Sequence, residues 1–120
     1  DGIVIPRCIY SRPQVAAVGL NEKTARSNGF DIKIGKSKMN KNVKALLIGE
    51  TQGFTKILVE SRSRKILGVH IVGENVSEVI SEASLAIRLG ATADDIASTV
   101  HPFPTFSEAL TEAAREIEIY

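Results

Sequence analysis

A change of hydrophobic period near Gly73 constrains the fold of this chain more than any other feature of its sequence. Before Gly73, the runs "FTKILVE" and "ILGVHIV" are rich in β-branched and aliphatic residues, and the polar stretch "SRSRK" separates them. This pattern predicts a β-hairpin with a loop of about five residues. After Gly73, "NVSEVISEASLAIRLG" has an apolar period of about 3.6 residues, which predicts an amphipathic helix. A hairpin followed by such a helix favours a fold in which helices pack on a sheet.

Alternation along the two predicted strands assigns a shared face to one set of side chains. That face carries Thr55, Ile57 and Val59 on the first strand, and Leu67, Val69 and Ile71 on the second. His70 points to the opposite face. We interpret it as a structural residue, because a lone histidine on a strand seldom has another role.

Local signals place the other elements, which are short. Extended runs are expected at 5–10, 15–20 and 30–39, and helices at 21–29, 43–48 and 92–99, with a last helix from Thr105 onward. Strands therefore precede most of the helices, and no strand–helix–strand repeat is present. This order indicates an α+β fold, with a mostly antiparallel sheet and helices packed on one side. We expect one domain, residues 1–120.

The ends and faces of the helices can be predicted from capping residues and periodicity. Asn75 with Glu78, Thr92 with Asp95, and Thr105 with Glu108 have the spacing of a capping box, and Gly90 is expected to end the helix that follows Asn75. The stripe of that helix is Val76, Val79, Ile80, Ala83 and Ile87, widened by Leu85, Ala86 and Leu89. The last helix has the stripe Phe106, Ala109, Leu110, Ala113 and Ile117, with Ser107, Glu112, Arg115 and Glu116 facing away. The first stripe is wide enough to serve a second partner besides the sheet.

Composition and charge exclude several classes of function. The formal net charge is +1, so no basic or acidic surface points to nucleic acid or to a membrane. No apolar run is long enough to cross a bilayer. Cys8 is the single cysteine, which leaves no internal disulfide and suits a soluble protein of a reducing compartment such as the cytoplasm. Carboxylates at metal-ligand spacing from the histidines are absent, so no metal site is expected. The chain starts at Asp1, and we expect a fragment of a longer protein.

The stretch "TVHPFPTFSEAL", residues 99–110, has two interpretations. As a rigid turn, its prolines stiffen the backbone, and Thr105 with Glu108 caps the helix. An X–Pro bond at this point is also a favourable place for a cis peptide. As a catalytic corner, a histidine oriented by a glutamate is a standard general acid/base pair. That would require His101 to fold back toward Glu108, seven residues later.

Four segments resemble the C-terminal interface domain of the pyridine nucleotide–disulfide oxidoreductases, and most of all that of the dihydrolipoamide dehydrogenases. "YSRPQVAAVGLNEKTAR" is similar to the family pattern T-x-P-E-x-A-x-V-G-L-T-E-x-x-A. "GETQGFTKIL", "KILGVHIVGENVSEVISEASLAI" and "PTFSEAL" follow in the family's order and at its spacing. The resemblance covers nearly the whole chain. It also accounts for the lack of a G-x-G-x-x-G motif and of a cysteine pair, which in that family lie in upstream domains.

The resemblance implies a homodimer joined through this domain, and FAD and NAD bound by the full-length protein rather than by this fragment alone. A lipoyl-bearing protein is the partner implied for the full-length enzyme. The last family motif is H-x-H-P-T-x-S-E. The histidine before Pro-Thr is the general base, which faces the disulfide and flavin of the other subunit, and the glutamate orients it. The His–Pro bond is cis, and its backbone lies beside the flavin.

Phe103 stands at the position of that base, while Pro104, Thr105, Ser107 and Glu108 match the motif. A phenyl ring cannot carry a proton. Glu108 therefore remains as a catalytic candidate with His101 as a weaker one, and the backbone of Phe103 and Pro104 is the expected flavin contact. Soluble transhydrogenases and mercuric reductases also lack this histidine. The alternatives are such a relative, a purely structural dimerisation module, or an unrelated α+β binding module.

Overall fold

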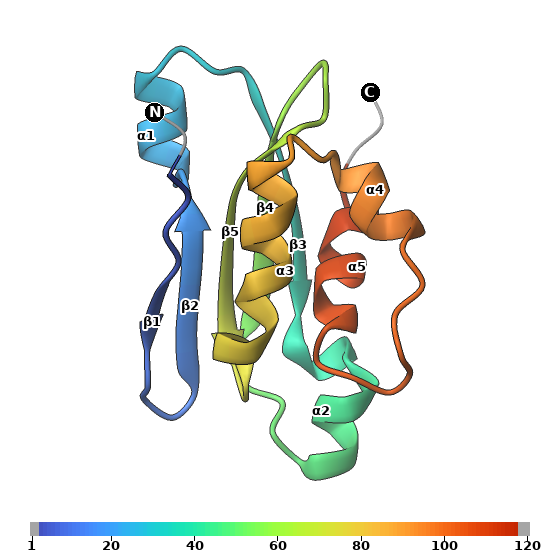
Figure 1. Ribbon diagram of the computed structural model, residues 1–120. Coiled ribbons are helices and arrows are strands. Elements are labelled where there is room, and N and C mark those ends of the chain that lie inside the picture. The colour runs from blue at the N-terminus through green and yellow to red at the C-terminus, as the bar shows by residue number, and fades with distance from the viewer. Residues whose placement is uncertain (1–2, 118–120) are drawn as a thin grey trace.

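The computed structural model describes residues 3–117, which form one five-stranded sheet with helices on it (Figure 1). The strands are β1 (Arg7–Ile9), β2 (Gln14–Gly19), β3 (Ile32–Lys38), β4 (Phe54–Glu60) and β5 (Ile66–Gly73). The helices are α1 (Glu22–Ser27), α2 (Val43–Ile48), α3 (Val76–Arg88), α4 (Ala93–Ser98) and α5 (Glu108–Arg115), with a 3-10 turn at Met39–Lys41. All neighbouring strands are antiparallel, in the order β1-β2-β5-β4-β3. The predicted α+β class is confirmed.

The predicted hairpin is formed by β4 and β5, with Ile57 opposite Val69 and Thr55 opposite Ile71. One residue of the predicted shared face, Leu67, does not lie on it. The register shifts after Leu58, so Val59 pairs with Ile66 and not with Leu67. A bulge inserts an extra residue into one strand and changes which side chain faces the core. Ile66 is consequently buried, whereas Leu67 is only half-buried.

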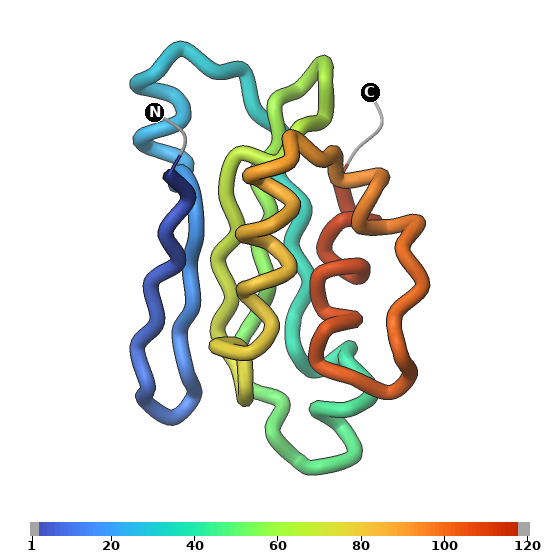
Figure 2. Tube along the Cα trace, in the orientation of Figure 1, coloured from blue at the N-terminus to red at the C-terminus, as the bar shows by residue number. Residues whose placement is uncertain are grey.

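The two longest helices cover one face of the sheet and lie side by side on it (Figure 2). Helix α3 packs on β2 and β5, and α5 packs on β3 and β4. The close approach of α5 depends on Gly35, because a Cβ atom there would stand 2.1 Å from the carbonyl oxygen of Ala113. All five apolar residues of the predicted α5 stripe are buried. The expected arrangement of helices on one side of the sheet is confirmed for these elements.

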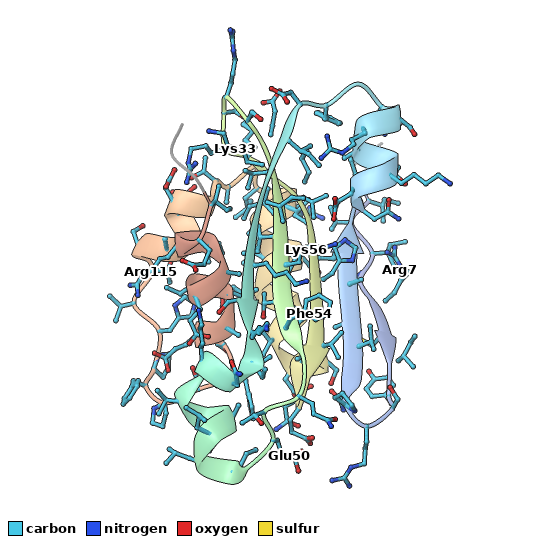
Figure 3. The ribbon with its side chains drawn as sticks, turned by 180° about the vertical axis from the view of Figure 1, so that it is seen from behind. Arg7, Lys33, Glu50, Phe54, Lys56 and Arg115 are labelled. Carbon is cyan, nitrogen blue, oxygen red and sulfur yellow. The ribbon has the colours of Figure 1, made fainter. Side chains whose placement is uncertain are left out.

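The opposite face of the sheet carries Phe54 and Lys56, which are seen from behind in Figure 3. Lys36 on β3 lies over the Phe54 ring, with its Nζ 4.7 Å from the ring centroid. The short helix α1 reaches this face, since Glu22 accepts a hydrogen bond from Lys56 Nζ at 2.8 Å. These contacts are polar or mixed, so this face differs from the apolar face under α3 and α5.

The predicted helix ends are confirmed at some positions and wrong at others. Thr92 and Asp95 form both bonds of a capping box at α4, and Gly90 has a positive φ of 68° after α3. Asn75 does not cap α3 with its side chain. Its backbone is left-handed, with φ 58°, and the Glu78 N–H bonds to its carbonyl instead. A capping side chain requires an extended backbone at this position, which the turn before α3 does not provide.

The apolar arc of α3 is wider than the sheet covers. Ala86 is buried against the sheet, while Leu85 and Leu89 are exposed at 57% and 72%. Residues four apart lie on the same side of a helix, so these two leucines form a continuous apolar strip on the surface.

No helix among residues 3–117 is long and apolar enough to cross a membrane. The same residues hold no group of three or more His, Cys, Asp or Glu side chains that suits a metal ion.

Candidate functional site

The stretch 99–108, which we call the corner, runs from the end of α4 to the start of α5. It descends beside α5 toward the end of the sheet where α2 lies (Figure 1). Thr99 ends α4, and its carbonyl is already bound to the ring of His101. The corner therefore connects two helices and reaches a third, and its conformation depends on all of them.

Thr105 holds the middle of the corner with side-chain and backbone bonds. Its N–H donates to Glu108 Oε1 at 3.0 Å, which is one half of the predicted capping box. The other half is missing, since the Thr105 hydroxyl donates to the Pro102 carbonyl at 2.8 Å. Threonine hydroxyls compete for such local carbonyls instead of capping. Helix α5 consequently begins at Glu108, three residues later than predicted, and the bond between Thr105 and Glu108 stabilises the corner itself.

The two phenylalanines of the corner have different environments. Phe106 is buried in the core, whereas Phe103 is 70% exposed. The Phe103–Pro104 peptide is cis, as the sequence favours for an X–Pro bond at this point, and Arg12–Pro13 is also cis. Phe106 thus anchors the corner, and Phe103 is presented at its surface.

His101 does not pair with Glu108 in the structure. Its Nε2 lies 2.8 Å from Glu82 Oε2 on α3, and only 7% of its side chain is exposed. Its Nδ1 lies 3.0 Å from both the Thr99 carbonyl and the Thr111 hydroxyl. His101 therefore bonds to Glu82 on α3 and does not fold back toward Glu108. No spacing rule in the sequence links His101 with that helix. These contacts tie the corner to α3 and α5.

A polar pocket of about 310 Å³ lies between the corner and α5. Its lining includes His101, Glu108, Thr111, Glu112 and Arg115. Sequence periodicity placed Glu112 on the outward side of α5, but the structure shows it half-buried. Burial raises the pKa of Glu112 to about 7, a hydrogen bond from Asn42 opposes this, and the charge of Glu108 adds to it. Glu108, a like charge four residues before Glu112 on the helix, is the one sequence signal that could have indicated this raised pKa.

Sequence reasoning also missed two residues that hold the corner, Glu82 and Asn42. Glu82 lies on the polar side of α3, and no feature of the sequence distinguishes it from the other charged residues of that helix. Asn42 is fully buried and donates to the Thr105 carbonyl at 3.0 Å. The carboxyl and imidazole side chains of this site are Glu108, Glu112 and His101. The exposed large apolar side chains of the corner are Val100 and Phe103.

Comparisons with known proteins agree with this fold. The family model for the pyridine nucleotide-disulphide oxidoreductase dimerisation domain matches residues 5–114. The dihydrolipoyl dehydrogenase of Bacillus subtilis is 48% identical over 114 residues, which is 95% of this chain and 24% of that protein. Dihydrolipoyl dehydrogenase 3 of Pseudomonas aeruginosa is 45% identical over 114 residues, with the same coverage. The chain thus spans about a quarter of the length of the curated relatives it matches.

Solved structures show the same arrangement of strands and helices. LpdA from Mycobacterium tuberculosis superposes with a TM-score of 0.86 at 25% identity, covering 92% of this chain and 24% of that one. The HOCl-induced flavoprotein disulfide reductase RclA from Escherichia coli superposes with a TM-score of 0.89 at 21% identity, covering 93% and 26%. At that identity the second likeness concerns the fold alone. The match over residues 5–114 and the identity to curated relatives show that this chain belongs to the dimerisation-domain family of the pyridine nucleotide-disulphide oxidoreductases.

Proposed function

We propose that residues 1–120 are the interface domain of an FAD- and NAD-dependent enzyme similar to dihydrolipoyl dehydrogenase. In this proposal the domain joins two subunits and presents its corner to the flavin of the partner subunit. Relatives named dihydrolipoyl dehydrogenase match almost the whole chain and support this activity. The lipoyl-bearing partner protein and a cytoplasmic location belong to the same proposal.

Exposed apolar side chains support the homodimer. Leu85 and Leu89 form the strip on α3, and Leu46 and Leu47 are exposed on α2. Contiguous apolar surface of this kind marks contacts with other proteins or domains. In the proposed enzyme, the second subunit and the upstream domains are the two structures that would cover these exposed side chains.

The surface of the corner suits a flavin. A flavin ring is planar and largely apolar, and the exposed Phe103 ring with the half-buried Pro104 forms an apolar surface of matching chemistry. When bound, the flavin supplies electron transfer between a dithiol and a nicotinamide. Phe103 and Pro104 would exclude water from one edge of that site, because neither side chain has a hydrogen-bonding group.

Proton transfer is the step for which this corner lacks the usual residue. Phe103 has no titrating group, and the carboxylate of Glu108 that would orient a base there is bound to the Thr105 N–H. His101 is mostly enclosed and already bonded to Glu82, so it holds the corner in place and is poorly placed to replace the base. The observation that carries this part of the proposal is Phe103 itself, exposed at the position of the family's general base.

The same observation favours a second candidate function. A relative that passes electrons from a nicotinamide to an acceptor needing no proton from this corner has no use for a base there. Soluble transhydrogenase-like and mercuric reductase-like enzymes are of this type. The two candidates share the fold, the flavin and the dimer, and differ in whether dihydrolipoamide is a substrate.

The test uses the full-length protein, loaded with FAD, and compares the wild type with Phe103→His and Phe103→Asn. We expect slow NAD-linked oxidation of dihydrolipoamide in the wild type. Phe103→His should raise turnover about 10²-fold, since a positioned base contributes about 10²- to 10⁴-fold. Phe103→Asn is the matched control, because it adds polarity without a titrating group.

An increase confined to Phe103→His supports the dihydrolipoamide function and the position of the corner. Equal turnover in all three proteins would show that residue 103 is not at the base position. Flavin-dependent oxidation of NADH or NADPH without any dihydrolipoamide oxidation in any of the three would support the second candidate instead.

A further inference from the structure

Asn42 is a fully buried amide that joins three separate parts of the fold. It precedes α2, and its Oδ1 accepts a hydrogen bond from the Ala45 backbone N–H at 3.0 Å. Its Nδ2 donates to the Thr105 carbonyl at 3.0 Å and to Glu112 Oε2 at 3.3 Å. Because a backbone N–H can only donate, the amide oxygen must face α2, and the amide nitrogen must face the corner.

Helix capping explains only one of these bonds. Asn21 caps α1 in the same way, with its Oδ1 accepting from the Thr24 N–H at 2.8 Å in an exposed setting. Aspartate caps helices about as well as asparagine does. An ionised aspartate has no donor, however, and could not make the two bonds that Asn42 directs at Thr105 and Glu112. The choice of an amide at this position therefore relates to the corner and not to α2.

The bond from Asn42 to the Thr105 carbonyl is the hydrogen bond that holds the second half of the corner from outside, as the bonds of His101 to Glu82 and Thr111 hold its first half. The N–H and hydroxyl of Thr105 bond to Glu108 and Pro102, each three residues away. The carbonyl of Thr105 bonds to Asn42, which is 63 residues away in the chain. Phe103 stands two residues before Thr105, and its ring is mostly exposed, so burial does little to hold it. Its position therefore depends on how Thr105 is held on one side of it and His101 on the other.

We propose that Asn42 is a positioning residue of the corner. Its amide fixes the Thr105 carbonyl against the start of α2 and thereby sets where Phe103 and Pro104 are presented. This inference rests on the proposed function for its relation to the flavin, while the positioning itself concerns only residues of this chain. Asn42 acts through Thr105, since its hydrogen-bond partners are Thr105, Glu112 and Ala45 and include neither Phe103 nor Pro104.

The second amide bond makes the position sensitive to charge. Glu112 is half-buried, and the hydrogen bond from Asn42 favours its ionised form, against the effects of burial and of Glu108. Asn42→Asp would keep the oxygen that caps α2, but would turn an acceptor toward the Thr105 carbonyl and a negative charge toward Glu112. Both contacts become repulsive. Asn42→Ser removes the amide donors without adding a charge.

The test uses the four phenylalanines of this chain, Phe30, Phe54, Phe103 and Phe106, as reporters. The chain is labelled with 4-fluorophenylalanine, and ¹⁹F NMR spectra are recorded for the wild type, Asn42→Asp, Asn42→Ser and Asn21→Asp. Asn21→Asp is the matched control, because it makes the same chemical change at the cap of a helix of the same length. Urea unfolding of each variant verifies that it is folded.

We expect the Phe103 signal to shift by more than its line width in both Asn42 variants. The Phe54 signal on the far face of the sheet should stay in place, and Asn21→Asp should leave Phe103 unchanged. If Asn42→Asp does not fold, Asn42→Ser decides the matter. A Phe103 signal that stays unchanged in a folded Asn42 variant overturns the proposal.

A second readout separates this inference from the proposed function. In the FAD-loaded full-length protein, Asn42→Ser should shift the visible absorption and circular dichroism bands of the flavin, whereas Asn21→Asp should not. If Phe103 moves in the ¹⁹F spectrum and the flavin bands do not change, Asn42 positions the corner, but the corner does not lie at the flavin. That result contradicts the proposed function and leaves the positioning role supported.

Discussion

Strands β4 and β5 are held by a backbone ladder with one bulge, whereas the corner is held by side chains that bond to backbone atoms and to other side chains. In the hairpin, Ile57, Val59 and Val69 are almost completely buried between the sheet and its helices. In the corner, His101 contacts Glu82 and Thr105 contacts Asn42, while Phe103 is left exposed. The comparison teaches that the two regions depend on different forces. The hairpin is stabilised by apolar burial, and the corner by a few directed polar bonds from distant elements.

The largest expected effect is at the hairpin. Ile57→Ala should lower the free energy of unfolding by about 2–5 kcal/mol, since it removes a fully buried side chain and leaves a cavity. Leu47→Ala is the control, because Leu47 is exposed and should change stability by less than about 0.5 kcal/mol. Urea unfolding measures both. A loss below about 1 kcal/mol for Ile57→Ala would contradict the account of the sheet as an apolar core.

A smaller effect is expected from the carboxyl beside the corner. The pKa of Glu112 is raised from 4.5 to about 7, so the folded chain binds this proton more tightly than the unfolded chain. Stability should therefore be greatest below about pH 4.5 for this group and should fall as the pH rises to about 7. Such a shift corresponds to about 3 kcal/mol in full. Solvent screening of a half-exposed group reduces it to about 1 kcal/mol.

Glu112→Gln tests this, since glutamine keeps an acceptor for Asn42 and loses the titration. Its stability should vary less between pH 5 and pH 8 than that of the wild type, and it should be the more stable protein at pH 8. Equal pH dependence in the two proteins, measured by urea unfolding, would show that Glu112 does not titrate as the burial predicts.

The smallest effect is expected at the polar face of the sheet, and it has the opposite sign. Bonding to Lys56 lowers the pKa of Glu22, so this contact stabilises the fold at neutral pH and is lost as the pH falls below about 4.5. The pair is partly exposed and should contribute about 0.5 kcal/mol. Glu22→Gln should lower the free energy of unfolding by this amount at pH 7. High salt should reduce the difference between variant and wild type, because it screens the ion pair, and thermal unfolding measures both. A cost above about 2 kcal/mol would mean that the polar face stabilises the fold as strongly as the core does.

The same difference explains what the sequence could predict. Period and turn residues located the β4–β5 hairpin, α3 and α4, because local chemistry determines those elements. The bulge that places Ile66 in the core depends on how β4 and β5 meet, and the left-handed backbone at Asn75 depends on the turn before α3. Neither is encoded in a short pattern.

The corner was located from the resemblance and from its prolines, but its contacts were not. The bonds of His101 to Glu82 and of Asn42 to Thr105 join residues 19 and 63 positions apart. Only the fold brings such residues together, so no spacing rule predicts them. Phe103 differs from these contacts, because the sequence alone singles it out and the structure adds only that it is exposed.

The most direct test of the account asks whether Phe103 lies at the flavin. The chain contains no tryptophan, so Phe103→Trp introduces one into this domain, and tryptophan quenches flavin emission when the two rings touch. The control is Arg62→Trp, in the β4–β5 loop at the opposite end of the sheet from the start of α5 (Figure 1). In the FAD-loaded full-length protein we predict strongly reduced flavin emission in Phe103→Trp and wild-type emission in Arg62→Trp. Equal flavin emission in the two variants would contradict the placement of the corner at the active site.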